Sequence, residues 1–261
     1  MTVSRLRARC PECRTLTAVA VDTGYECHAC GRTYSAGLVR VPRAWGEGGE
    51  RMAEAAFIEL PYPEAGVVDE ESLTEQTLAL AASVPERPLV LGGCCCAHVG
   101  AVEGLATRFD KLGVVWFDAH GDLNTPETSP SGNPWGMPLR MLIDSGTVEP
   151  GDVVLVGARN LDEPEKEFIA ARGICTGERG VKEALSGVDA VYVALDCDVL
   201  DPDEEIVSFM PEPGGLTVTE TSAILKQVAA ARPVAGAGLS GLAPAPANAT
   251  PLARLVLALG L

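Results

Sequence analysis

The sequence has little positive charge and no long apolar run. Its 20 Lys and Arg residues stand against 36 Asp and Glu residues, which gives a formal charge of −16. A nucleic-acid surface needs clustered Lys and Arg, so we expect no nucleic-acid partner. No stretch reaches the roughly 18 apolar residues of a membrane span, and the arginines near the start lead into no apolar signal-peptide core. We therefore expect a cytoplasmic protein with no membrane partner.

The nine cysteines lack the spacing of a secreted disulfide framework. Three are consecutive, and four form two Cys-x-x-Cys pairs. This usage is typical of metal binding and reduced thiols, and so of a reducing compartment. The pairs Cys10 with Cys13 and Cys27 with Cys30 can each present two sulfurs to one tetrahedral ion, which predicts a zinc ribbon holding one structural Zn²⁺. Disulfide pairing is the alternative interpretation.

The balance of charge changes near residue 42. The segment from Arg5 to Arg40 is locally basic, whereas the remainder is strongly acidic. We predict two parts, a zinc ribbon over residues 1–42 and a larger domain over residues 43–261. Between Gly37 and about Gly66 the pattern is irregular, with glycines and prolines interrupting short apolar runs. We expect a linker there that passes into a first strand.

Beyond that segment, short Val- and Leu-rich runs alternate with stretches of helical period. This alternation indicates repeated βα units on a parallel sheet. We predict strands at Pro88–Leu91, Gly113–Phe117, Asp152–Val156, Ala190–Leu195 and Val234–Leu239. We predict helices at Val99–Phe109, Glu163–Arg172, Val218–Ala231 and Pro251–Leu259. Ligands of such sheets bind at the carboxyl ends of the strands, where the most unusual residues of this sequence lie.

Two acidic motifs follow two of the predicted strands. The first holds Asp118, His120 and Asp122; the second holds Asp196 and Asp198, which share a face by the two-residue period of a strand. Buried carboxylates are costly without a cation. We therefore expect a cage for two divalent ions, with the carboxylates of Asp118 and Asp196 within about 8 Å of each other, because paired ions lie about 3.5–4 Å apart. For the first motif by itself, a solvated loop is the alternative.

Four runs resemble the arginase and agmatinase (ureohydrolase) family: Trp116–Pro126, Ser131–Asn133, Asp196–Pro202 and Pro211–Thr217. The match covers most of Pro88 to Leu261. The resemblance implies a three-layer α/β/α domain with a parallel sheet and a binuclear manganese centre. It also implies a small-molecule guanidino substrate, hydrolysed to urea by a metal-bridging hydroxide, and a homo-oligomer.

The resemblance assigns a role to each residue of the two motifs. Asp118 and Asp196 match the bridging carboxylates, while His120 and Asp198 match the remaining ligands of one ion. Asp122 matches a ligand of the second ion and is the candidate catalytic residue.

The second ion has an unusual candidate ligand. Cys95 stands where the family has a histidine after Gly-Gly-Asp. A thiolate there favours softer ions such as zinc, iron, cobalt or nickel over manganese. His98, one helical turn later, is a possible substitute ligand, and a helix-face histidine without function is the alternative.

Four further residues resemble those that bind the amino-acid part of the substrate in the arginase branch. Asn124 and Ser131 match positions near the α-carboxylate, and Asp162 and Glu165 match positions near the α-amino group. Their joint occurrence favours an amino-acid-like substrate over a decarboxylated amine. The alternative is that Asn124 and Ser131 only shape a turn.

Three positions depart from the family pattern. Trp135 replaces a histidine proposed as a proton shuttle, Met210 replaces a threonine, and Gly241 replaces the glutamate that anchors the guanidinium. A buried guanidinium without that anion loses charge-assisted hydrogen bonds of about 1.5–3 kcal/mol. Trp135 can stack on a planar group or cation of the substrate, or simply line the pocket.

These observations predict a metal-dependent hydrolase of the arginase type that acts on a C–N bond of a guanidino or amidino, amino-acid-like substrate. Hydrolysis of guanidines is expected to be slow or absent. The competing hypothesis is a family member without turnover, in which the old site only binds a ligand and the zinc ribbon docks to a partner or to nucleic acid. A third hypothesis is an amidine or imine hydrolase whose substrate is not arginine.

Overall fold

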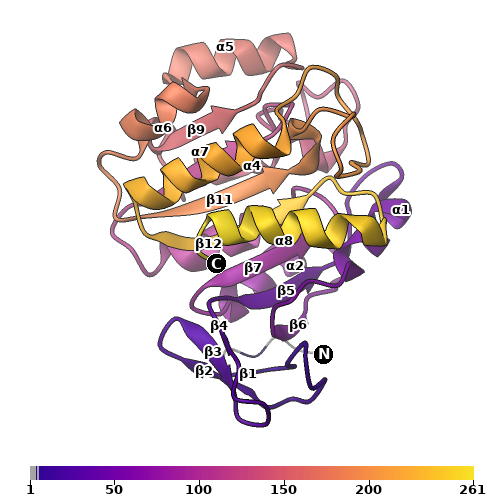
Figure 1. The fold of residues 1–261 in the computed structure, drawn as a ribbon. Coiled ribbons are helices and arrows are strands. Elements are labelled where there is room, and N and C mark those ends of the chain that lie inside the picture. Colours follow the sequence, from indigo (N-terminus) through magenta and orange to yellow (C-terminus); the bar gives the residue numbers. More distant parts are fainter. Residues whose placement is uncertain (1–3, 5) are drawn as a thin grey trace.

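The computed structural model describes Ser4 and residues 6–261, and its strands form two separate sheets (Figure 1). The smaller sheet is antiparallel and lies at the N-terminal end of the chain. Its strands are β1 (Arg7–Ala8), β2 (Ala18–Val21), β3 (Gly24–Cys27) and β4 (Thr33–Tyr34).

The larger sheet has eight strands, all parallel, in the order β10-β9-β8-β11-β12-β7-β5-β6. Its strands are β5 (Gly37–Val41), β6 (Glu64–Val67), β7 (Pro88–Gly92), β8 (Leu112–Phe117), β9 (Val153–Val156), β10 (Cys175–Thr176), β11 (Ala190–Asp196) and β12 (Val234–Ser240). The five predicted strands are all present, with each end within one residue of its predicted place. Their continuous apolar runs reflect burial on both faces.

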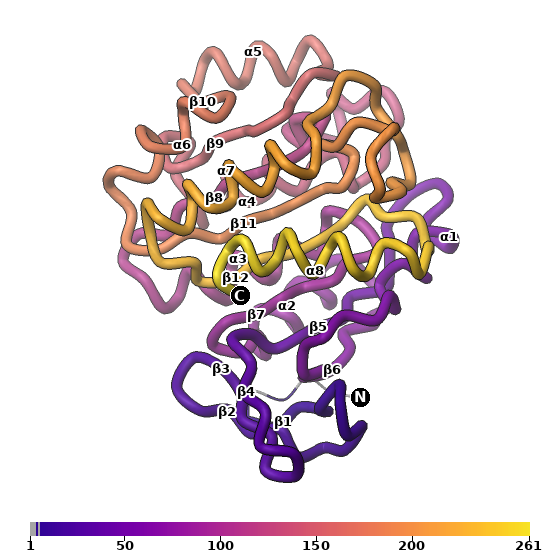
Figure 2. Tube along the Cα trace, in the orientation of Figure 1, coloured from indigo at the N-terminus to yellow at the C-terminus, as the bar shows by residue number. Residues whose placement is uncertain are grey.

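Helices cover both faces of this sheet, as Figure 2 shows most clearly for α7 and α8 on one face. The helices are α1 (Gly49–Ala53), α2 (Leu73–Ser83), α3 (Ala97–Ala106), α4 (Pro138–Asp144), α5 (Glu163–Arg172), α6 (Glu178–Ala184), α7 (Val218–Ala231) and α8 (Ala249–Ala258). Short 3₁₀ turns lie at Glu54–Phe57, Pro134–Gly136, Pro150–Asp152, Cys197–Val199 and Pro246–Asn248.

Alternate residues of each strand enter two different cores. On β11, Val191 and Val193 belong to the core under α6, α7 and α8, whereas Tyr192 and Ala194 belong to the core under α2, α3 and α4. This alternation follows from the two-residue period of a strand. The predicted three-layer α/β/α fold is therefore confirmed.

The linker predicted from Gly37 is wrong at its start. Gly37–Val41 is β5, fully buried between β6 and β7. The strand is hard to recognise in the sequence because the charged Arg40 interrupts its apolar run. The Arg40 guanidinium is neutralised by Glu64 Oε2 at 2.5 Å and donates to the carbonyls of Ala56 and Ile58.

The small sheet is attached to the edge of the large one through the main chain. Arg9 N donates to Glu64 O at 2.8 Å, and Glu64 N donates to Arg9 O at 2.9 Å. An ion pair between Arg14 and Glu59 adds a second contact. The small sheet ends at Tyr34, and β5 already belongs to the large sheet. Among the residues that the structure describes, no helix has the length and apolarity to cross a bilayer.

Candidate metal centre

The two acidic motifs leave the sheet side by side. Strands β8 and β11 are neighbours, with Phe117 paired to Leu195. Asp118 therefore emerges next to Asp196, and the loop after β8 turns toward the one after β11. Cys95 arrives from β7, on the other side of β12, at the same carboxyl edge. This is the edge at which parallel sheets bind ligands.

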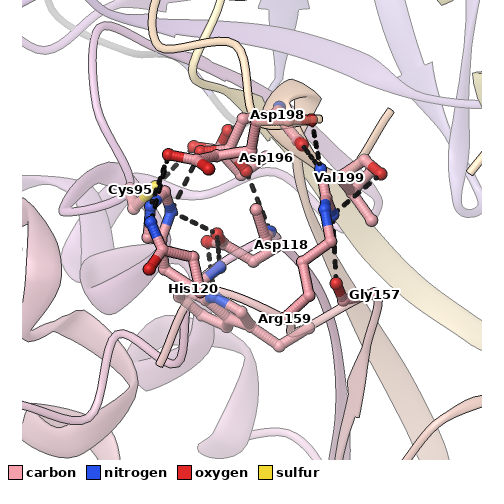
Figure 3. Close-up of polar contacts among 12 residues, drawn as sticks. Cys95, Asp118, His120, Gly157, Arg159, Asp196, Asp198 and Val199 are labelled. Carbon is pink, nitrogen blue, oxygen red and sulfur yellow. Dashed lines mark hydrogen bonds and ion pairs between the residues drawn. The ribbon is translucent and has the colours of Figure 1, made fainter. Parts of the chain in front are cut away.

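The predicted ligands form two overlapping groups. Ligand atoms of Cys95, Asp118 and Asp122 lie within 4.8 Å of one another, and so do those of Asp118, His120 and Asp198. Asp196 joins them through its Oδ2, which accepts a hydrogen bond from Cys95 Sγ at 2.8 Å (Figure 3). The carboxylates of Asp118 and Asp196 thus meet the expected separation of less than about 8 Å. Because Asp118 belongs to both groups, the arrangement can hold two cations that share it.

Burial raises the pKa values of these carboxylates, so ionising them costs free energy. Desolvation, with the charge of Asp198, raises the pKa of Asp196 to about 7. Desolvation, with the charge of Asp118, raises the pKa of Asp198 to about 6. The pKa of Asp122 is also raised well above its usual range by burial and by Asp118. Divalent cations would remove this penalty, so the donor set fits two such ions.

Asp122 carries a second sign of a cation site. Its Oδ2 is buried and has no hydrogen-bond partner among residues 4 and 6–261. Its backbone is left-handed, with φ of 52°, which is uncommon for a residue with a side chain. Buried polar atoms normally have partners, so an unpaired carboxylate oxygen facing Cys95 and Asp118 indicates a ligand.

His120 lies between two carboxylates. Its Nδ1 is 3.2 Å from Asp118 Oδ1 and 3.0 Å from Asp198 Oδ2. Although burial opposes a charge on the ring, hydrogen bonds to these carboxylates raise the pKa of His120 to about 12. A metal ion bound by the neutral ring would have to displace that proton.

Backbone and side-chain donors fix the orientation of the carboxylates. The amide of His120 donates to Asp118 Oδ1 at 2.7 Å, and the amide of Asp198 donates to Asp196 Oδ1 at 3.0 Å. Arg159 holds the neighbouring loops together by donating to the carbonyls of Gly157, Asp198 and Val199 (Figure 3).

His98 is not placed as a ligand. It is fully buried on α3, and its two ring nitrogens lie 3.0 Å from Tyr192 Oη and 3.1 Å from Ser240 Oγ. Burial lowers the pKa of His98 to about 3, so the ring is neutral.

A cavity of about 330 Å³ opens above the metal-binding groups. The residues predicted to bind substrate, Asn124, Ser131, Trp135, Asp162 and Glu165, all line it. The sequence motifs thus meet in one pocket.

Within that pocket, Glu165 is already engaged. Its Oε1 accepts from Leu123 N at 3.0 Å, and its Oε2 accepts from Asp162 N at 2.9 Å. Asn124 Nδ2 donates to Asp162 Oδ2 at 2.8 Å. The Asp-x-x-Glu spacing at the start of a predicted helix is the capping-box signal that could have revealed the structural role of Glu165.

One wall of the pocket is apolar, and the sequence indicates only part of it. Met52, Trp135 and Phe209 pack around Cys94, and Met210 lies beside them. Trp135 and Met210 depart from the family pattern, whereas Met52 and Phe209 come from segments with no motif. Nothing local in the sequence marks these two residues as pocket residues.

Gly241 borders this wall, since its carbonyl accepts from Phe209 N at 2.7 Å. Its φ is 66°, and a Cβ built there would overlap the carboxylate of Asp196. The position therefore tolerates no side chain in this backbone, and replacing the glycine with glutamate would disturb the metal-binding groups.

The four cysteines of the small sheet also gather at one point. All four sulfurs lie within 4.8 Å of one another, with Cys10 Sγ 3.7 Å from Cys30 Sγ and Cys13 Sγ 3.6 Å from Cys27 Sγ. A hydrogen bond with Thr17 helps to lower the pKa of Cys27 to about 6. This donor set fits one tetrahedral zinc ion.

Known proteins resemble this chain in sequence and in fold. A model of the arginase family matches residues 51–259. The arginase of Staphylococcus aureus (strain MRSA252) is 40% identical over 159 residues, which cover 51% of this chain and 53% of that protein. The chain thus spans about half the length of the curated relatives it matches.

Solved structures extend the comparison to most of the chain. The arginase of Bacillus caldovelox superimposes with a TM-score of 0.75 at 29% identity, covering 86% of this chain and 97% of that one. The formimidoylglutamase of Bacillus subtilis subsp. subtilis str. 168 gives a TM-score of 0.70 over 86% and 85%. Its identity is 19%, so that likeness concerns the fold alone.

Proposed function

The chain belongs to the arginase family, and on that premise we propose that it is a metal-dependent hydrolase of the arginase type. It acts on a C–N bond of a guanidino or amidino, amino-acid-like substrate. The observation that carries the proposal is the pair of donor groups sharing Asp118 at the floor of a pocket. Four buried carboxylates in one cluster are costly without cations, so a metal site explains this cluster better than structural ion pairs do.

The cage residues divide between the two ions. Asp118 and Asp196 would be shared between the two ions, His120 and Asp198 would complete the ligands of one ion, and Asp122 with Cys95 would complete those of the other. When bound, paired divalent ions lower the pKa of a shared water and so supply hydroxide near neutral pH. The backbone amides that donate to Asp118 and Asp196 keep these carboxylates aligned for that task. Manganese is the ion that the family implies, and the thiol of Cys95 favours a softer ion on its side.

The polar rim binds the amino-acid end of the substrate. Asp162, with one carboxylate oxygen held by Asn124, can accept a hydrogen bond from an ammonium group. Ser131 is exposed at the rim and offers its hydroxyl. Glu165 shapes the rim by holding the backbone of Leu123 and Asp162 rather than by touching the substrate.

The reacting end of the substrate meets the apolar wall. Trp135 and Phe209 can pack on a planar group, and Gly241 supplies no anion for a guanidinium. Arginine hydrolysis is therefore slow or absent.

The remaining assignments concern the whole protein. The part of the chain up to Tyr34 forms a zinc ribbon with one structural Zn²⁺, and the arginase-like domain begins with β5 at Gly37 rather than at the predicted residue 43. We expect a cytoplasmic location, which the spacing of the cysteines favours, and a homo-oligomer, which the family resemblance implies. The strongly acidic chain argues against a nucleic-acid surface across the whole molecule.

A second candidate function rests on Gly241. If the missing carboxylate abolishes turnover, the protein binds a ligand in the same pocket, or a partner through the ribbon, without hydrolysing it. The two candidates make different demands on the cage, because only the first needs both ions.

The test combines metal analysis with a release screen. Purified protein is assayed for bound metal and for release of urea, ammonia or amine from arginine, agmatine, guanidine and formimino compounds. The proposal expects metal in the cage and turnover of at least one amidino substrate, lost in Asp118→Ala. Metal in the cage without turnover of any compound would favour the binding module. A cage without metal would contradict the claim that these residues hold two ions.

A further inference from the structure

A row of buried polar groups lies directly beneath the cage. Strands β11 and β12 are paired so that Asp196 lies beside Ser240 and Ala194 beside Gly238. Tyr192 shares its face of β11 with Asp196, because side chains alternate along a strand. The imidazole of His98, from α3, fills the space over Gly238. A Cβ on Gly238 would collide with both the Tyr192 hydroxyl and the His98 ring.

The hydrogen bonds in this row run in one direction. Ser240 Oγ donates to Asp196 Oδ2 at 3.2 Å, so its lone pairs are left to accept from His98 Nε2 at 3.1 Å. A neutral imidazole has one donor and one acceptor nitrogen. His98 Nδ1 is then the acceptor, and the hydroxyl of Tyr192 donates a hydrogen bond to it at 3.0 Å. Tyr192, His98 and Ser240 are all fully buried, so water cannot substitute for a lost member.

His98 also braces the second bridging carboxylate. Its ring meets the indole of Trp116 edge to face, with the ring centroids 5.2 Å apart. Trp116 Nε1 donates to Asp118 Oδ2 at 3.2 Å. One imidazole therefore supports the donors to both Asp118 and Asp196.

We propose that His98 is a positioning residue for the metal cage, which fixes the Ser240 hydroxyl on Asp196 and the Trp116 indole on Asp118. This inference rests on the proposed function, since it concerns the ligands of that cage. Cys95 Sγ and Ser240 Oγ both donate to Asp196 Oδ2, at 2.8 Å and 3.2 Å. Ser240 is the donor of this pair that is not itself a candidate metal ligand.

The test measures metal affinity separately from stability. Mn²⁺ and Co²⁺ are titrated into the full chain, and the ion that wild-type protein binds more tightly becomes the probe. His98→Leu and Ser240→Ala should each raise its dissociation constant in the cage about 10–100-fold, the usual cost of removing a residue that orients a ligand. The zinc content of the ribbon should not change. The double variant should be no weaker than the worse single variant, because both act through one chain of bonds.

Two further variants separate positioning from packing. His98→Gln keeps an N–H that can reach Ser240, so its metal affinity should stay close to that of the wild type. Val102→Ala removes a fully buried side chain one helical turn further along α3 and should lower the melting temperature without changing metal affinity. If His98→Leu does not fold, Ser240→Ala carries the test, since it removes only one hydroxyl.

The outcomes are distinct. Wild-type protein that binds neither ion in the cage would defeat the proposed function itself. Wild-type binding that survives unchanged in Ser240→Ala and His98→Leu would overturn the positioning role alone. The positioning role of His98 would also be overturned if Val102→Ala weakened metal binding as much as His98→Leu does, because the effect would then be one of general packing.

Discussion

The floor and the apolar wall of the pocket follow different rules, although they lie in contact. The floor consists of carboxylates, an imidazole and a thiol whose positions are fixed by strand ends and backbone amides. The wall consists of Met52, Trp135, Phe209 and Met210, held by packing. Metal chemistry constrains the floor to a narrow set of residue types. The wall needs only to complement a substrate, and Trp135 and Met210 depart from the family pattern there, whereas the floor departs from it at Cys95.

The largest effect on the floor is expected from removing Asp118, the ligand that both donor groups share. Asp118→Ala should empty the cage and lower any turnover by on the order of a thousandfold, as expected when a preorganised electrostatic group is lost. Metal content is measured by mass spectrometry on the native protein. The matched control, Cys10→Ser with Cys27→Ser, should lose the ribbon zinc and keep the cage metal. Equal metal loss from both sites in either variant would mean that the sites are not independent.

The boundary between floor and wall is tested at Gly241. Gly241→Ala should weaken metal binding at least tenfold, because its Cβ would overlap Asp196 and a left-handed alanine costs about 1–2 kcal/mol. Gly146→Ala is the matched control, since Gly146 has a similar φ of 73° and open space around it. This control should lose stability but no metal. Comparable metal affinity in the two variants would show that the overlap with Asp196 does not matter.

The floor should also respond to pH in a way that the wall does not. The raised pKa values of Asp196, about 7, and Asp198, about 6, mean that the folded, metal-free protein holds these protons more tightly than the unfolded chain. Their stabilising contribution is present near pH 4 and is lost as the pH rises through these values, so the melting temperature should fall by several degrees between about pH 5 and pH 8.

With metal bound, the trend should reverse. Cations displace the protons, and binding therefore strengthens as the pH rises. Thermal unfolding with and without chelator checks both halves. A metal-free protein that became more stable over this range would contradict the raised pKa values.

The smallest effect is expected at the wall. Trp135→Ala should leave metal content unchanged and raise KM about threefold to thirtyfold for a substrate with a planar reacting group, since a stacking or cation–π contact contributes about 0.5–2 kcal/mol. A steady-state comparison of KM with kcat on the best compound of the screen measures this. A selective fall in kcat with KM intact would assign Trp135 to the reaction rather than to binding.

The floor was also the part that could be predicted from sequence. Each ligand follows a buried apolar strand, and the two-residue spacing of Asp196 and Asp198 shows that they share a face. Strand β5 was missed because Arg40 interrupts its pattern, and its partner Glu64 lies far along the chain.

The wall and the layer beneath the floor could not be predicted in this way. Ser240 contacts Asp196 only because β11 and β12 pair in one particular register. That register cannot be predicted from the sequence alone. Met52 and Phe209 reach the pocket through loop paths that carry no periodic signal. Residues whose role depends on a partner distant in sequence are the ones that sequence alone leaves unassigned.

The central claim, two ions held at one shared carboxylate, is tested most directly by anomalous diffraction from crystals of the metal-loaded protein at the edges of manganese and zinc. We predict two peaks about 3.5–4 Å apart, with Asp118 and Asp196 between them, and a third, zinc peak among Cys10, Cys13, Cys27 and Cys30. A single peak at the ribbon, with the carboxylate cluster free of metal at saturating ion concentration, would contradict the account.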